Sequence, residues 1–179
     1  MRTLETKRLI LRQVSLKDAG ILYQELGCNP EMIRYTGWNP YNSEESATEK
    51  IKQDIANSER EGFYSWIIEA DGRPIGTIGA YGYDQEISSI EIGYSIFRAE
   101  WGHRYASEAA ARVVKFLIHE EGINRVHAWC HCENLASAAV LESAGLRQEG
   151  LLRQAMRNPD GTYADQKLFG IVKDDYDKA

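Results

Sequence analysis

Residues Gly102 to Ala106 have the features of a phosphate-binding turn, because they stand between two segments of different periodicity. Before the turn, Ser88–Ile96 alternates apolar and polar side chains, which is typical of a strand. After it, apolar residues recur at helical spacing: Ala106, Ala109, Ala110, Val113, Val114, Leu117 and Ile118. A strand that enters a helix through such a turn directs several unpaired backbone N–H groups, and the positive end of the helix dipole, at one point. We therefore expect a phosphate to bind there.

A second group of reactive side chains is Cys130-His131-Cys132. Alternate residues of a strand face opposite sides, so His131 would lie opposite both sulfurs. A fourth ligand at a spacing typical of a metal site is missing from the sequence. We expect no metal and interpret the two cysteines as buried strand residues. Three further histidines have no partner that the sequence identifies: His103, His119 and His127.

Length and composition predict one domain spanning residues 1–179, with an apolar share of 43% that is sufficient for a core. No apolar run is long enough to cross a bilayer, and the N-terminus lacks a signal-peptide core, so we expect no membrane association. The 3 cysteines argue against a disulfide framework and favour a cytoplasmic protein. A net charge of −6 disfavours direct nucleic-acid binding and mildly favours a cationic substrate, although plain solubility is the commoner reason for such a charge.

The hydrophobic pattern predicts a mixture of helices and strands that positions these residues. The expected strands are 9–14, 63–70, 74–83, 88–96, 125–132, 147–157 and 163–172. Helices are expected after Ser15, from Asn29-Pro30 through Arg34, from Asn42 to about Glu61, from Tyr105, and over Leu135–Ala144. Asn134 is the expected N-cap of the helix that ends at Gly145, and the tail from Asp174 is expected to fray.

Two motifs within this order carry a resemblance: Trp101-Gly102-His103-Arg104-Tyr105-Ala106-Ser107-Glu108-Ala109, and Asn134-Leu135-Ala136-Ser137 followed by Ser143-Ala144-Gly145-Leu146. The chain resembles the GNAT superfamily of N-acetyltransferases, and within it the branch that acetylates the N-termini of ribosomal proteins. The resemblance extends from Arg8-Leu9-Ile10-Leu11-Arg12 to the last strand. It implies a mixed, mostly antiparallel sheet of about seven strands, flanked by helices, with a splayed central parallel pair. It also implies acetyl-CoA as co-substrate.

The acyl-CoA signature of that superfamily, Gln/Arg-x-x-Gly-x-Gly/Ala, corresponds to Trp101-x-x-Arg104-x-Ala106. The resemblance therefore implies that the whole turn binds the cofactor, through Trp101, Gly102, His103, Arg104, Tyr105 and Ala106. Arg104 replaces a usual glycine, so we expect it to adopt helical φ and ψ at the helix start and to avoid positive φ. Its guanidinium would bind the pyrophosphate or the 3′-phosphate, or else point into solvent.

In this superfamily the pantetheine arm lies between the two splayed strands, which correspond here to Glu91–Ile96 and Arg125–Cys132. Backbone groups near Tyr94, Ser95 and Ile96 would pair with its amides, as in β-augmentation. Asn134 would stand at the mouth of the gap and bind the arm, act as a helix cap, or do both.

Acetyl transfer needs a neutral amine, a stabilised oxyanion and a proton for the departing thiolate. Our candidate base is Glu91, opposite Ile90 and Ile92 on the central strand, with a cross-strand salt bridge as the alternative role. The oxyanion would meet a backbone N–H near Ile92 or Gly93.

Leu141 occupies the position where many relatives carry a tyrosine that acts as the general acid for the thiolate. We favour Ser137 as the acid over Tyr105 or Tyr94, with a plain helix-start serine and solvent protonation as alternatives. Trp38 and Tyr41 would line the pocket for the acceptor amine or pack in the core.

The resemblance thus implies an acetyl-CoA-dependent N-acetyltransferase, with the α-amine of a protein N-terminus as the leading acceptor. One alternative is a small amine such as a polyamine, an amino acid or an antibiotic. Another is a catalytically silent acyl-CoA-binding module. The oligomeric state is open, with a homodimer as one alternative.

Overall fold

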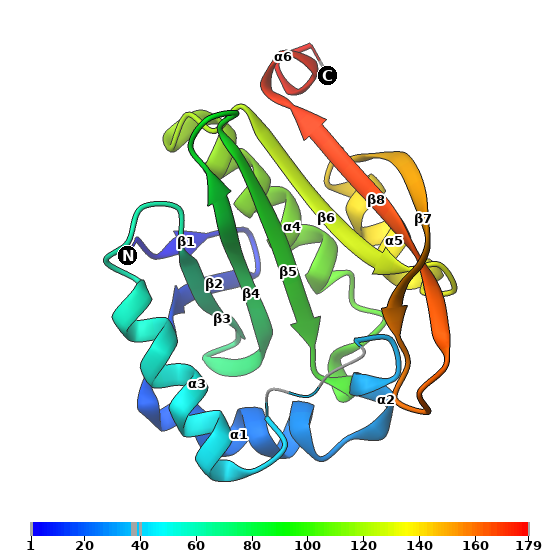
Figure 1. Ribbon diagram of the computed structural model, residues 1–179. Coiled ribbons are helices and arrows are strands. Elements are labelled where there is room, and N and C mark those ends of the chain that lie inside the picture. The colour runs from blue at the N-terminus through cyan, green and yellow to red at the C-terminus, as the bar shows by residue number, and fades with distance from the viewer. Residues whose placement is uncertain (1, 37–38, 40, 179) are drawn as a thin grey trace.

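The computed structural model describes residues 2–36, 39 and 41–178. Within them, eight strands form one sheet in the order β1-β2-β3-β4-β5-β6-β8-β7 (Figure 1). β5 and β6 pair in parallel, and the other neighbours in this order pair antiparallel. The strands are β1 (Leu4–Glu5), β2 (Leu9–Gln13), β3 (Tyr64–Ala70), β4 (Arg73–Asp84), β5 (Ser89–Ile96), β6 (Arg125–His131), β7 (Arg147–Arg157) and β8 (Tyr163–Val172).

Helices cover both faces of this sheet. α4 (Tyr105–Lys115) and α5 (Leu135–Ser143) lie on one face, and α1 (Ala19–Leu22) and α3 (Glu44–Asn57) lie on the other (Figure 1). The alternation along β3 reflects this division, since Trp66 and Ile68 belong to the core under α4, whereas Ile67 packs with residues of α1 and α3. The remaining helices are α2 (Pro30–Ile33) and α6 (Lys173–Tyr176), with π-helical turns at Tyr23–Gly27 and Phe116–Glu120 and short 3-10 turns at Leu16–Asp18 and Arg98–Glu100.

The helix after the phosphate-binding turn forms as its periodicity predicts. α4 buries Ala109, Ala110, Val113 and Val114 against the sheet. A helix with this apolar stripe is held by packing more than by intrinsic propensity, so its first turn has a defined position relative to β5. The strand–turn–helix unit is thereby confirmed.

The splayed parallel pair is confirmed by the register of β5 and β6. The two strands pair over Ser89–Glu91 and Arg125–His127. Beyond that rung β5 continues to Ile96 and β6 to His131 without further pairing between them. Figure 1 shows the two strands diverging toward their carboxyl ends. The region where the two strands diverge is called the fork. Its two arms are β5 beyond Glu91 and β6 beyond His127.

Most sequence-based boundaries agree with the structure to within one residue, and three features differ by more. The short strand Leu4–Glu5 was not predicted, because two residues carry no periodic signal. The third helix begins after Ser43, whose side chain accepts from the Ser46 N–H, and it ends at Asn57. The tail does not fray directly after β8, since Lys173–Tyr176 forms a helical turn. The closing hairpin has the predicted bounds.

No helix in the described ranges is long and apolar enough to cross a membrane.

Candidate active site

The fork leaves one edge of β5 without a partner strand. Residues Ile92 to Ile96 pair with β4 on their other side, where Tyr94 lies opposite Ile78 and Ser95 opposite Thr77. The Ile96 carbonyl already accepts a hydrogen bond from Trp101 Nε1 at 2.7 Å. Trp101 therefore anchors the turn to the end of β5, while the edge near Tyr94 and Ser95 faces the gap where an extended amide chain would pair.

The turn between β5 and α4 combines two left-handed residues. Gly102 has φ 84° and Arg104 has φ 63° with ψ 20°. The prediction that Arg104 adopts helical φ and ψ is therefore wrong. A non-glycine residue in this region costs about 1–2 kcal/mol, because Cβ approaches the following carbonyl oxygen. The first backbone bond of the helix runs from Glu108 N–H to Arg104 O at 3.2 Å, so the preceding N–H groups remain available to an anion.

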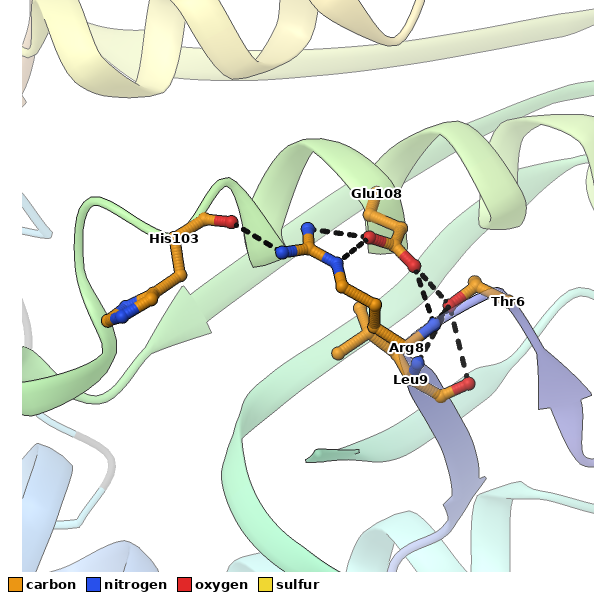
Figure 2. A network of polar contacts seen from close by, with 5 residues as sticks. All are labelled: Thr6, Arg8, Leu9, His103 and Glu108. Atoms are coloured by element: carbon orange, nitrogen blue, oxygen red, sulfur yellow. Dashed lines mark hydrogen bonds and ion pairs between the residues drawn. The ribbon is translucent and has the colours of Figure 1, made fainter. Parts of the chain in front are cut away.

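A polar network fixes this turn to the loop before β2 (Figure 2). Glu108 accepts from Thr6 Oγ1 at 2.6 Å, from the Arg8 N–H at 3.0 Å and from Arg8 Nε at 2.7 Å. Arg8 also donates to the backbone O of His103 at 3.1 Å. Its guanidinium lies 4.7 Å from the centre of the Tyr105 ring, and that ring stacks on His103. The Arg8 side chain thus holds the turn from outside the helix.

The contacts of Glu108 determine its protonation state. Burial acts to raise the pKa of Glu108, but the hydrogen bonds from Thr6 and Arg8 outweigh it and hold the pKa below its ordinary value. Glu108 is therefore an anion paired with a cation, and it does not repel a phosphate at the neighbouring turn as strongly as a free carboxylate would. Arg8 belongs to the N-terminal motif of the sequence, but its contacts with Glu108 and His103 were not predicted.

Glu91 lies at the base of the fork, in the last paired rung. Its register partners are Tyr81 on β4 and His127 on β6, so these three side chains share one face of the sheet. Burial raises the pKa of Glu91, and side-chain hydrogen bonds with Tyr81 and Trp129 act in the opposite direction. The Glu91 side chain is 30% exposed and lies on the face opposite Ile90 and Ile92, which are buried in the core. It can therefore meet a ligand at the fork.

On the other arm, Asn134 caps α5 and orients Ser137. The Asn134 Oδ1 accepts from the Ser137 N–H at 3.0 Å, which confirms the predicted cap. The Tyr94 hydroxyl donates to the Ser137 carbonyl at 3.0 Å and lies 2.9 Å from its Oγ. Burial raises the pKa of Tyr94 well above its ordinary value, so its phenol stays protonated at neutral pH. The predicted residues Tyr94, Asn134 and Ser137 are thus brought together.

The two residues predicted to line the pocket for the acceptor amine are not brought to the fork by any contact in the described residues. Tyr41 is partly buried and packs against the smaller core with α1 and α3, whereas Trp38 lies outside the described residues. An open pocket of about 510 Å³ lies between α2, the end of β6 and the β7–β8 turn. Its lining includes Glu31, Glu133 and Asp160, and also Asn158, whose Oδ1 is buried without a hydrogen-bond partner. Arg34 and His131 also line the pocket, so its three carboxylates outnumber one guanidinium, and this balance suits a cationic group.

Cys130 is buried in the core, as predicted, and burial raises the pKa of its thiol. Cys132 is only partly buried and lies just beyond the end of β6, so the prediction of a buried strand residue is wrong for it. His131 is also buried, and its Nδ1 accepts from the Glu133 N–H at 3.0 Å. Across the described ranges, no group of three or more His, Cys, Asp or Glu side chains is arranged to hold a metal ion.

A divergent parallel strand pair joined to a phosphate-binding turn defines an acyl-CoA-binding acyltransferase site, and the comparisons agree. Residues 8–147 match the acetyltransferase (GNAT) domain model. An N-acetyltransferase called p20 from Bacillus licheniformis is 33% identical over 178 residues, which cover 98% of this chain and 99% of the relative. The chain belongs to the GNAT family of acetyltransferases.

Two solved structures show the same fold. RimL, a ribosomal-protein alpha-N-protein acetyltransferase in complex with coenzyme A, has a TM-score of 0.89 at 19% identity, covering 97% of this chain and 99% of that one. RimJ of Mycobacterium smegmatis, in complex with a CoA disulfide, has a TM-score of 0.87 at 24% identity, covering 97% of this chain and 88% of that one. Acetyl-CoA, the acyl donor of the family, fits the residues present: the free edge of β5 suits its pantetheine amides and the turn suits its phosphates.

Proposed function

We propose that this acetyltransferase transfers the acetyl group of acetyl-CoA directly to a primary amine, and that the acceptor is the α-amine of a protein N-terminus. The observation that carries the proposal is the fork, which has Glu91 at its base and, farther along β5, Tyr94 in contact with Ser137 of α5. RimL and RimJ support the acceptor, since both share this fold over most of the chain. We place the protein in the cytoplasm, where acetyl-CoA and nascent proteins occur together.

The chemistry divides between residues of β5 and Ser137 of α5. Glu91 takes a proton from the acceptor ammonium, which leaves a neutral amine able to attack the thioester carbonyl carbon. A backbone N–H of Ile92 or Gly93 donates to the oxyanion that forms. The carbon–sulfur bond then breaks, and the nitrogen of the new amide releases its second proton to solvent. The thiolate takes a proton from solvent directly, or from Ser137, which regains one from solvent.

The acceptor enters through the pocket beside α2. Its Glu31, Glu133 and Asp160 carboxylates attract a protonated amine, and the pocket adjoins the end of β6, one arm of the fork. Glu31 is ion-paired with Arg98, and Arg34 adds a cation to the lining, so the net negative charge of the pocket comes from Glu133 and Asp160. A pocket open to solvent suits the end of a polypeptide as well as a small molecule.

The test is thiol release from acetyl-CoA, measured with a panel of N-terminal peptides, polyamines, amino acids and aminoglycosides. The proposal predicts the highest kcat/KM with a peptide. A higher kcat/KM with a small amine would overturn the proposed acceptor but not the proposed reaction. Stabilisation of the fold by CoA without turnover of any amine would make the protein an acyl-CoA-binding module and overturn the proposed reaction.

A further inference from the structure

The side chain of His127 has a polar environment that its position in the sequence does not suggest. It is the register partner of Glu91, and its Nε2 lies 3.9 Å from Glu91 Oε2. On the other side of the ring, Nδ1 lies 3.2 Å from the hydroxyl of Ser89, which is buried. The His127 side chain is only 19% exposed, so the imidazole is held between these two groups.

The contact with Ser89 is compatible with an acceptor facing Glu91, because a hydroxyl can accept from Nδ1–H as well as donate to Nδ1. A neutral imidazole carries one N–H and one lone pair. When Nδ1 carries the proton and donates to Ser89 Oγ, Nε2 presents its lone pair to the carboxyl group of Glu91. Burial lowers the pKa of His127 and Arg125 lowers it further, whereas Glu149 and a backbone hydrogen bond with Ile90 act in the opposite direction. The ring is therefore neutral at the pH where an amine is acetylated.

The other neighbours of Glu91 hydrogen-bond its ionised form. Tyr81 from β4 and Trp129 from β6 stabilise the carboxylate. The indole N–H has no lone pair to offer a new carboxylic O–H, and a phenol oxygen is a weaker acceptor than the lone pair of a neutral imidazole. A separation of 3.9 Å exceeds a hydrogen bond, but a small rotation of the Glu91 side chain closes it, as catalytic contacts tighten when substrate binds.

We propose that His127 is a positioning residue for Glu91, whose Nε2 accepts a hydrogen bond from the carboxylic acid that forms when Glu91 removes a proton from the acceptor amine. One N–H bond of the ammonium breaks, one O–H bond forms on Glu91, and that O–H donates to Nε2. His127 thereby makes Glu91 a stronger base without touching the substrate. The inference rests on the proposed function, because it concerns the proton that Glu91 removes from the acceptor amine in that reaction.

The experiment compares His127→Phe with His127→Gln. Phenylalanine keeps a ring for the edge-to-face contact with Trp129, now at 6.2 Å, and removes the acceptor. Glutamine restores an acceptor oxygen near the position of Nε2. The matched control is His119→Phe, since His119 has a carboxylate at 3.7 Å and an edge-on aromatic ring, but beside α6.

The expected result is that His127→Phe lowers kcat about tenfold, leaves KM for acetyl-CoA unchanged, and moves the acid limb of the pH–rate profile to lower pH. His127→Gln should recover most of kcat and the position of the limb. A drop in kcat with an unmoved limb, or equal losses in both variants, would mean that the ring only packs, and would overturn the inference.

A second measurement does not need turnover. Carboxyl ¹³C NMR of labelled glutamate, with the Glu91 signal assigned through Glu91→Gln, follows the titration of Glu91 in wild type and in His127→Phe. The inference predicts a lower pKa for Glu91 in His127→Phe, because its protonated form loses an acceptor. An unchanged or higher pKa overturns it. If no amine is acetylated by the wild type, the proposed function fails and this titration still decides the role of His127.

Discussion

The Tyr94 hydroxyl joins β5 to α5. It donates to the Ser137 carbonyl at 3.0 Å and lies 2.9 Å from Ser137 Oγ. A phenol has one hydrogen, so with that hydrogen on the carbonyl, the Ser137 hydroxyl is the donor in the second contact. Ser137 therefore points its proton at Tyr94 in the absence of a thiolate. The two hydroxyls behave as one unit.

This pairing predicts a non-additive double-mutant cycle. Tyr94→Phe and Ser137→Ala should each slow turnover about threefold to tenfold, and the double variant should be little slower than the worse single one. Affinity for CoA, measured by calorimetry, should stay near that of the wild type. Additive losses would show that the residues act separately, and a collapse of CoA affinity in Ser137→Ala would make Ser137 a binding residue.

At Arg104, stability and affinity should change in opposite directions. Replacement by glycine removes the strain at φ 63° and should raise stability by about 1 kcal/mol, or about 3 °C in Tm. It also removes a cation beside the phosphate-binding turn and should weaken CoA binding about tenfold. Arg104→Asn is the control, because asparagine tolerates the left-handed region but carries no charge. Unchanged affinity in both variants would place the guanidinium in solvent.

The network around Glu108 predicts both an affinity effect and a pH dependence. Arg8→Ala should weaken CoA binding about fivefold and lower Tm by about 3 °C, because the turn loses its contact with the loop before β2. Arg2→Ala is the control, since Arg2 forms a more exposed ion pair with Glu120. A similar loss of CoA affinity in both variants would contradict the role of Arg8.

The sign of the pH dependence follows from the lowered pKa of Glu108. A carboxylate whose folded-state pKa is depressed contributes stability above its unfolded value, about 4.5, and loses it as the pH falls through the folded value. The difference in Tm between wild type and Arg8→Ala should therefore be full at neutral pH and shrink below about pH 4. A difference that is constant down to about pH 3 would show that Glu108 is not the group involved.

The acidic pocket should affect the acceptor and not the donor substrate. Glu133→Gln should raise KM for a cationic amine about threefold to fivefold, leave KM for acetyl-CoA unchanged, and reduce the salt dependence of the amine KM. Glu142→Gln, on the exposed face of α5, is the control. Equal changes in both KM values would mean that the pocket is not the acceptor route.

The features predicted correctly from the sequence are those that depend on residues close together in the chain. Alternation along Ser89–Ile96, helical spacing after Tyr105 and the Asn134 cap are local patterns, and each is confirmed. Contacts between distant segments were not predictable from such patterns. Arg8 meets Glu108 across 100 residues of sequence, and His127 meets Glu91 only because of the register between two parallel strands. The left-handed φ of Arg104 was missed because glycine usually occupies such a position, so an arginine there indicated ordinary helical geometry.

The most direct test of the account compares the pH dependence of kcat for wild type, Glu91→Gln and the exposed control Glu86→Gln, with a saturating N-terminal peptide. Burial raises the pKa of Glu91, so the wild-type acid limb should lie above the ordinary carboxyl value. Glu91→Gln should lose that limb and about 100-fold or more in kcat, with acetyl-CoA affinity within about twofold of wild type. Wild-type kcat and an unchanged limb in Glu91→Gln would contradict the assignment of Glu91 as the base at the fork.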